Sequence, residues 1–190
     1  MTQPIHPLQK FTGPMRLLHW SMAGLLMGLL VAGVYMAQIP MTAPDKFDIY
    51  PWHRAFGVVA FAGVIIRLIV RFSSPVPMIL GGIPWYERRA AQGAQIFLYT
   101  AMLVMPPLGY IASSAVPEFP GIPVLHSIWF FGAELPLFPI EKNYDTTKFL
   151  ITIHMYVGYA MIAVIAAHVG GALKHRFFDA PENDALSKMI

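Results

Sequence analysis

The chain has 190 residues, 56% of them hydrophobic and 12% charged, with a formal net charge of +3. Soluble domains carry about 25% charged residues, so this composition predicts an integral membrane protein formed by a single domain over residues 1–190. The absence of cysteine excludes disulfides, thiolate metal sites and cysteine nucleophiles. No basic run is typical of a nucleic-acid-binding arm, so nucleic acid is not an expected partner.

Four apolar segments approach or exceed the roughly 20 residues that a membrane-spanning helix needs. In chain order they cover about 16–38, 52–72, 91–114 and 148–173. Pro106 and Pro107 predict a kink in the third helix. The sequence therefore predicts an all-α bundle of four transmembrane helices in up-down order. A long loop over about 115–147 joins helices three and four, and we expect it to be ordered at the membrane surface without regular secondary structure.

The basic residues are unevenly divided between the two ends of this bundle. Nine lie in or beside the N-terminal tail, the link between spans two and three, and the C-terminal tail, whereas four lie at the other end. Loops that stay in the cytoplasm carry the excess of lysine and arginine. Both termini are therefore predicted to be cytoplasmic, and the long loop external.

Four histidines fall inside or next to the predicted spans, where ionisable side chains are rare and usually functional. His53 and His154 lie near the external starts of their helices, whereas His19 and His168 lie near the cytoplasmic side. His154 and His168 are fourteen residues apart, close to four helical turns, so they share one helix face about 21 Å apart. The sequence thus predicts two histidine pairs, one at each depth.

Two imidazoles facing each other across a bundle can supply both axial ligands of a haem iron. We therefore predict two haem b groups, one held by His53 and His154 and the other by His19 and His168. Gly57 and Gly158 follow two of these histidines at four residues, where a missing side chain would leave room for a flat macrocycle. A haem-free alternative, in which the histidines form a proton or metal path, stays open.

Basic residues near each depth could pair with the carboxylates of a haem, because guanidinium binds carboxylate bidentately. Arg16, Arg67 and Arg71 are candidates at the cytoplasmic level, although ordinary interface residues would also occur there. Arg54, Lys142 and Lys148 are candidates at the external level. His175, two turns beyond His168, is either a boundary residue or part of a quinone or proton site.

Several stretches together resemble the bacterial cytochrome b561 family over nearly the whole chain. They are RLLHW, HRAFGVVAFAGVIIRLIVRFSSPVP, LYTAMLVMPPLGY and the segment from HMYVGY to the C-terminus, which includes ALKHRFFD. The resemblance implies a four-helix di-haem cytochrome of the bacterial inner membrane, with His19, His53, His154 and His168 as ligands. It also implies a quinone site, with ubiquinone as substrate. Members often have a histidine early in the third helix, where this sequence has Gln92 and Gln95.

Two hypotheses on function follow. In the first, the chain transfers electrons between a quinone pool and an external donor or acceptor, such as superoxide in some relatives, either as an electron carrier or as a quinone-linked oxidoreductase. A homodimer is possible in this case. In the second, it is the haem-bearing membrane anchor of a larger respiratory, hydrogenase or dehydrogenase complex. Its partner would then dock on the external loop, which is rich in aromatic residues: Trp129, Phe130, Phe131 and Phe138.

Overall fold

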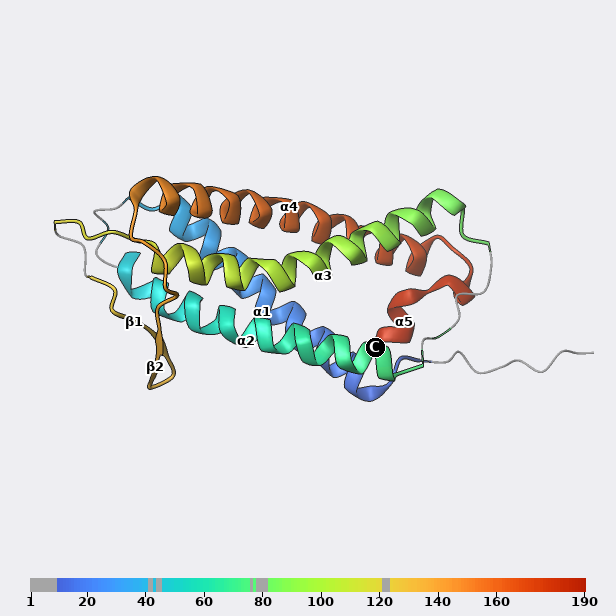
Figure 1. Ribbon diagram of the computed structural model, residues 1–190. Helices are drawn as coiled ribbons and strands as arrows, with labels where there is room; N and C mark the ends of the chain where they lie inside the picture. The colour runs from blue at the N-terminus through green and yellow to red at the C-terminus, as the bar shows by residue number, and fades with distance from the viewer. Residues whose placement is uncertain (1–9, 41–42, 44–45, 76, 78–81, 121–123) are drawn as a thin grey trace, which may run out of the picture.

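The computed structural model describes residues 10–40, 43, 46–75, 77, 82–120 and 124–190. Its four long helices are α1 (Gly13–Gln38), α2 (Lys46–Ser73), α3 (Trp85–Ser114) and α4 (Tyr144–Phe177). All four are long and apolar enough to cross a membrane. Figure 1 shows them side by side, with successive helices running in opposite directions. The predicted four-helix up-down bundle is confirmed.

Three of the helices begin several residues before the predicted spans. α2, α3 and α4 begin at Lys46, Trp85 and Tyr144, whereas the apolar segments suggested 52, 91 and 148. Each of these early first turns carries an acidic residue, which the positive end of a helix dipole stabilises. Hydropathy alone detects only the part of a helix that lies in lipid, so it misses such polar turns. The three acidic residues are Asp48, Glu87 and Asp145.

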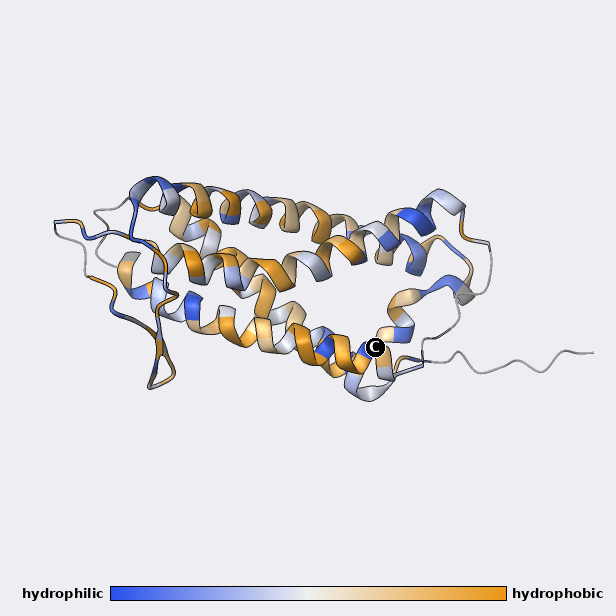
Figure 2. Cartoon of the chain, in the orientation of Figure 1, coloured by the Kyte–Doolittle hydropathy of each residue, from blue (hydrophilic) through white to orange (hydrophobic). Residues whose placement is uncertain are grey.

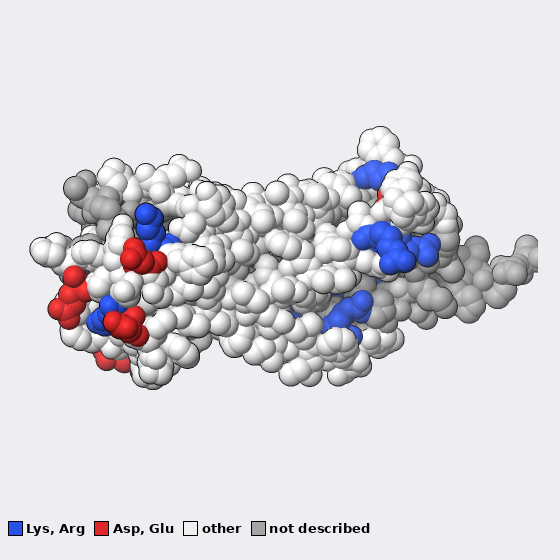
Figure 3. Space-filling view, turned by 45° about the horizontal axis from the view of Figure 1, so that its top comes forward, with Lys and Arg blue, Asp and Glu red and all other residues white. Residues whose placement is uncertain are grey.

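The helices pack in chain order, α1 on α2, α2 on α3 and α3 on α4, and α4 also contacts α1 to close the ring. A small apolar core in the middle contains Met22, Val64, Met102 and Met161. In the most apolar window of each helix, only 6% to 17% of residues are buried. The apolar residues of these helices, orange in Figure 2, are therefore mostly outside the core and available to lipid tails. Charged residues gather at the two ends (Figure 3).

Pro106 and Pro107 lie inside α3, which continues through them to Ser114. Proline lacks the backbone N–H that a helix needs at that position, so it weakens the helix locally. The axis of α3 changes direction along its length in Figure 1, consistent with the predicted kink.

The long loop contains regular structure that the sequence analysis did not predict. β1 (Ser127–Phe130) and β2 (Ala133–Pro136) form an antiparallel hairpin, with Trp129 opposite Glu134 in its register. Phe131 and Gly132 form the turn, with φ values of 48° and 96°, a combination typical of the two-residue type I′ turn. A strand of four residues is too short for its alternation to be recognised in an aromatic loop. We call this end of the bundle the hairpin end.

The loop is tied to the end of α3 by several hydrogen bonds. The Ala115 carbonyl accepts from the Asn143 backbone N–H at 3.0 Å and from the Thr147 hydroxyl at 2.7 Å. The Ser114 hydroxyl accepts from the Phe138 backbone N–H at 2.9 Å. Asn143 in turn caps α4, because its side chain accepts from two N–H groups of the first turn. The segment is therefore an ordered cover over this end of the bundle.

The opposite end, which we call the terminal end, is closed by the last residues of the chain. A short 3-10 helix, η1 (Pro181–Asn183), precedes α5 (Ala185–Met189), and α5 folds back against the bundle (Figure 1). The Trp20 indole N–H donates to the Met189 carbonyl at 3.0 Å. No sequence pattern predicts this contact, which anchors α5 to α1.

Candidate functional site

At the hairpin end, α2 and α4 bring His53 and His154 together. Their ring centres are 6.2 Å apart, with 72° between the ring planes. The Nδ1 atoms of both rings are buried without a hydrogen-bond partner in good geometry. The backbone of Met105 lies close to the ring of His154. A buried polar atom without a partner is costly, so this pair has bonding capacity that the described residues do not use.

At the terminal end, α1 and α4 bring His19 and His168 together. Their ring centres are 6.5 Å apart, with 57° between the ring planes. Trp20 contacts the His19 ring edge-on, with 5.2 Å between ring centres. α4 therefore contributes one histidine to each pair, and the two pairs lie about 21 Å apart along its axis.

The spacing of each pair fits a metal ion bound between two imidazoles. An imidazole nitrogen binds a first-row transition metal at about 2 Å, so two such bonds place the ring centres about 6 Å apart. Both measured separations match this value. The donor set also fits haem iron, for which histidine is a common axial ligand.

Glycines near the histidines leave space that a side chain would fill. A Cβ atom at Gly57 would meet nothing within 4 Å, and one at Gly158 would meet only the Met105 methyl at 3.8 Å. Two further glycines approach the rings directly: a Cβ at Gly109 would come within 3.0 Å of His154, and one at Gly33 within 3.6 Å of His53. The sequence analysis did not select these two. They lie on helices α3 and α1, which carry no histidine at this level, so no spacing within one helix could identify them.

Arg67 contacts the terminal-end pair directly. Its guanidinium donates to the Nδ1 atom of His19 at 2.8 Å and to the Tyr99 hydroxyl at 3.0 Å, joining α2 to α1 and α3. The same group lies over the Tyr99 ring, 5.8 Å from its centre. Tyr99 is a residue that sequence reasoning missed, because a tyrosine in an apolar segment gives no distinctive signal.

The other predicted basic residues are placed differently. The Arg16 Nε atom is buried without a hydrogen-bond partner, and Arg71 is partly exposed. At the hairpin end, Arg54 donates to the Ser113 hydroxyl at 3.0 Å and lies over the Tyr50 ring. Among the described residues, none of these three arginines forms an ion pair with a carboxylate. Lys148 is exposed, and Lys142 donates to the Leu125 carbonyl at 3.4 Å.

His175 belongs to a polar cluster between the start of α3 and the end of α4. It is hydrogen-bonded to Asp179, and this bond holds the pKa of the Asp179 carboxyl below its ordinary value. Glu87, His175 and Asp179 offer ligand atoms within 4.8 Å of one another. However, Lys174 contacts both carboxylates, at 2.7 Å and 3.3 Å, so the cluster is satisfied as an ion-pair network.

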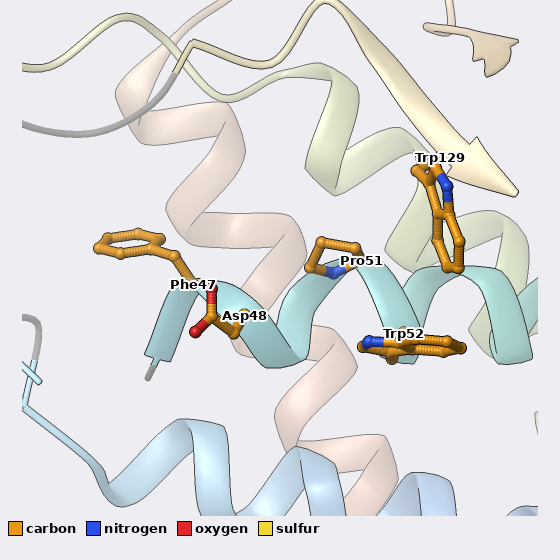
Figure 4. Close-up of a pocket in the computed structure, with 5 residues that line it drawn as sticks. All are labelled: Phe47, Asp48, Pro51, Trp52 and Trp129. Carbon is orange, nitrogen blue, oxygen red and sulfur yellow. The ribbon is translucent and has the colours of Figure 1, made fainter. Parts of the chain in front are cut away.

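Two hollows on the surface of the described residues are not lined by the paired histidines. One of about 360 Å³ is lined at the hairpin end by the first turns of α2 and by Trp129, whose ring meets that of Trp52 edge-on (Figure 4). Another, at the terminal end, is lined by Trp85, Arg88, Arg89, Gln92 and Ile83. Gln92 and Gln95 are both exposed, so the position at which relatives often have a histidine faces outward in this bundle.

The fold defines a multi-pass membrane protein with two histidine pairs, and α4 supplies one histidine to each pair. Residues 10–190 match the family model described as prokaryotic cytochrome b561, and the chain therefore belongs to this family of membrane electron-transfer proteins, whose cofactor is haem b. Among curated proteins it is similar to cytochrome b561 homolog 2 of Escherichia coli (strain K12). The two are 25% identical over 175 residues, which cover 90% of this chain and 86% of that protein.

Proposed function

We propose that the chain carries two haem b groups and transfers electrons between a quinone at the terminal end and a redox partner at the hairpin end. His53 and His154 would hold one haem, and His19 and His168 the other. The observation that carries this proposal is the pair of ring separations, 6.2 Å and 6.5 Å, at two depths of one bundle. Both separations fit a metal bound by two histidines.

Haem with two histidine ligands supplies one-electron, outer-sphere transfer, because no axial position is left for a substrate. The protein's own contribution is to fix the rings and to place cations beside them. Arg67 and Arg54 lie at the two levels, each held by a hydroxyl group and without a described carboxylate partner. Such partly buried cations favour negatively charged groups nearby, and the carboxylates of haem meet that requirement.

Chemistry at the terminal end requires proton exchange as well as electrons. Oxidation of one quinol to quinone releases two electrons and two protons, and the reverse reaction consumes them. Each quinone that reacts at the terminal end therefore requires two one-electron transfers to or from the redox partner at the hairpin end. His175 lies two turns beyond His168 and is hydrogen-bonded to Asp179, with Glu87 3.9 Å away. This polar cluster, next to the terminal-end pair, is the proposed quinone-side proton site.

The charge distribution supports a cytoplasmic location for the terminal end. That end carries nine basic and four acidic residues, whereas the hairpin end carries four basic and six acidic residues. The positive-inside rule then places the hairpin outside the cytoplasmic membrane. The acidic surplus there opposes the attraction of an anion such as superoxide, so the donor or acceptor at this end stays open.

Haem content and redox spectra test the proposal. The purified chain, reduced with dithionite, is expected to show a b-type spectrum with two haems per chain. His154→Ala and His168→Ala should each retain one haem, with different midpoint potentials, and the double variant should retain none. His126→Ala is the matched control, because that residue is exposed in the loop and both haems should remain. A colourless protein would instead favour the proton- or metal-path hypothesis.

The membrane-anchor hypothesis assumes the same haem chemistry, but in it the chain is a subunit of a larger complex. Mild purification from native membranes separates the two. A free monomer or homodimer with quinol-reducible haems supports the independent quinone-linked cytochrome. Stoichiometric recovery with a larger dehydrogenase or hydrogenase would support the subunit.

A further inference from the structure

Four aromatic side chains form a continuous surface at the hairpin end, which we call the aromatic edge: Trp52 and Phe56 of α2, Trp129 of β1, and Phe131 of the turn. Trp52 meets Trp129 edge-on with 4.9 Å between ring centres, and Phe56 meets Phe131 at 5.3 Å. The hairpin thus packs against α2 through aromatic rings, and the neighbouring Ile128 of β1 is fully buried.

The contact with Phe56 fixes the depth of the hairpin tip. Phe56 lies three residues beyond His53, inside the apolar run of α2 that begins at Ala55. Since Phe131 packs on this residue, the tip lies at the depth where the membrane-spanning segment starts. Figure 1 shows the hairpin beside the first turns of α2, running crosswise to that helix and extending to the side of the bundle.

The aromatic edge is only partly covered by the described part of the chain. Trp52 is 51% exposed, Phe56 38% and Phe131 47%. Further along, α2 carries other exposed apolar side chains, such as Ile66 and Ile69, in a helix apolar enough to cross a membrane. An aromatic surface at the start of such a helix matches the aromatic belts found at membrane interfaces.

The turn contains a phenylalanine in a left-handed backbone conformation, which indicates that the side chain has a role on the aromatic edge. Phe131 has a φ of 48°, a conformation that disfavours a bulky side chain. Type I′ turns strongly prefer asparagine followed by glycine, and here only the glycine, Gly132, is present. A strained residue of this kind is retained when its side chain has another use, and the Phe131 side chain is exposed and contacts Phe56.

We propose that the β1–β2 hairpin is an interfacial membrane anchor, whose tip inserts at the boundary between headgroups and acyl chains of the leaflet at the hairpin end. The partner of the aromatic edge is therefore phospholipid. Two features limit how deeply the tip can insert into the membrane. The exposed, charged Glu134 of β2 lies opposite Trp129, and the strand backbone has polar groups that need polar partners. The loop would thereby be held flat beside the His53 and His154 pair.

Spin labelling tests the depth directly, because the chain has no native cysteine. A nitroxide is attached to Ala133→Cys, an exposed position next to the intact turn, in liposomes of phosphatidylethanolamine and phosphatidylglycerol. Collisions with oxygen, which concentrates in lipid, are compared with collisions with a water-soluble nickel chelate. His126→Cys is the aqueous control and Ile66→Cys the lipid control. We expect an oxygen-to-nickel ratio at Ala133 between those of the two controls.

Two results would overturn the proposal. A ratio equal to that of His126→Cys would place the tip in water, and suppression of both collisions would mean that protein covers it, either a second copy or a partner subunit. A second variant isolates the ring: Phe131→Asn keeps a residue that suits the turn. In this background the label at Ala133 should become several-fold more accessible to nickel while the haem spectrum is unchanged. Unaltered accessibility would show that the ring does not hold the tip.

Discussion

Arg67 on α2 donates a hydrogen bond to the Nδ1 atom of His19 on α1, across 2.8 Å. Because guanidinium only donates, the His19 Nδ1 atom accepts this hydrogen bond. With iron bound through Nε2 the ring would then carry no proton, whereas a histidine ligand of haem normally carries one on Nδ1. The contact therefore links the charge of Arg67 to the protonation of the proposed ligand.

Arg67→Gln is expected to lower the midpoint potential of the haem bound by His19 and His168. Loss of a buried positive charge favours the oxidised, more positive iron, and the other haem, about 21 Å away, should change little. Redox titration of the purified protein measures both potentials. Arg88→Gln is the control, because that arginine is exposed. A raised potential would contradict this electrostatic account and would indicate that Arg67 instead ionises His19.

The sequence predicted the helices well because membrane spans depend on one dominant property, a run of apolar residues of sufficient length. It also grouped His53 with His154 and His19 with His168, because helix rise converts sequence position into depth. The hairpin was missed because its pairing depends on local turn geometry at Phe131 and Gly132. α5 was missed because five residues carry no periodic signal, and its position depends on contacts from Trp20 and Arg176.

The sequence could not predict which residues approach a site from a neighbouring helix. Gly57 and Gly158 were chosen because they follow histidines in the same helix, yet the closest approach to a ring is at Gly109, on α3. The same limit applies to Tyr99, which contacts Arg67 from another helix. Such contacts depend on helix rotation and kinking, and a hydropathy pattern specifies neither one.

Gly109→Ala should disturb the hairpin-end haem selectively. The added Cβ would come within 3.0 Å of the His154 ring, so the ring must tilt, and overpacking of this kind typically costs about 1–3 kcal/mol. Low-temperature electron paramagnetic resonance should show a shifted low-spin signal for one haem, or its loss. Gly33→Ala, with an ordinary 3.6 Å contact to His53, should have a smaller effect, and the open position Gly93→Ala none. An equal response in all three variants would contradict the steric explanation.

The orientation of the bundle can be measured with single cysteines. The chain has none of its own, so His126→Cys in the loop and Ala90→Cys near the start of α3, both exposed, each report one end. In spheroplasts, a membrane-impermeant maleimide should label His126→Cys and spare Ala90→Cys, because the terminal end carries the basic surplus. Inside-out vesicles should give the reverse pattern. Labelling of Ala90→Cys in spheroplasts would invert the proposed topology.

The docking of α5 should depend on the ionised form of Asp184. Burial alone raises the pKa of this carboxyl, but the hydrogen bonds from Arg176 and Ser187 outweigh it, so the pKa lies below its ordinary value of 3.8. A carboxyl whose pKa is lowered by folding stabilises the folded form above its unfolded pKa. That contribution is lost as the pH falls through the lowered folded value. Between pH 6 and pH 8 it should therefore be constant.

Asp184→Asn removes the charge but leaves a side-chain oxygen that can still accept from the Ser187 backbone N–H, so it isolates the ion pair with Arg176. We expect faster amide hydrogen exchange across α5 at pH 7, with Arg176→Gln giving the same increase and the double variant adding nothing further. Asp184→Ala also removes the helix cap and should cost about 1 kcal/mol more in local stability. After correction for intrinsic rates, the difference between wild type and Asp184→Asn should vanish below the lowered pKa. A difference that persists in acid would mean that the charge of Asp184 is not what holds α5 in place.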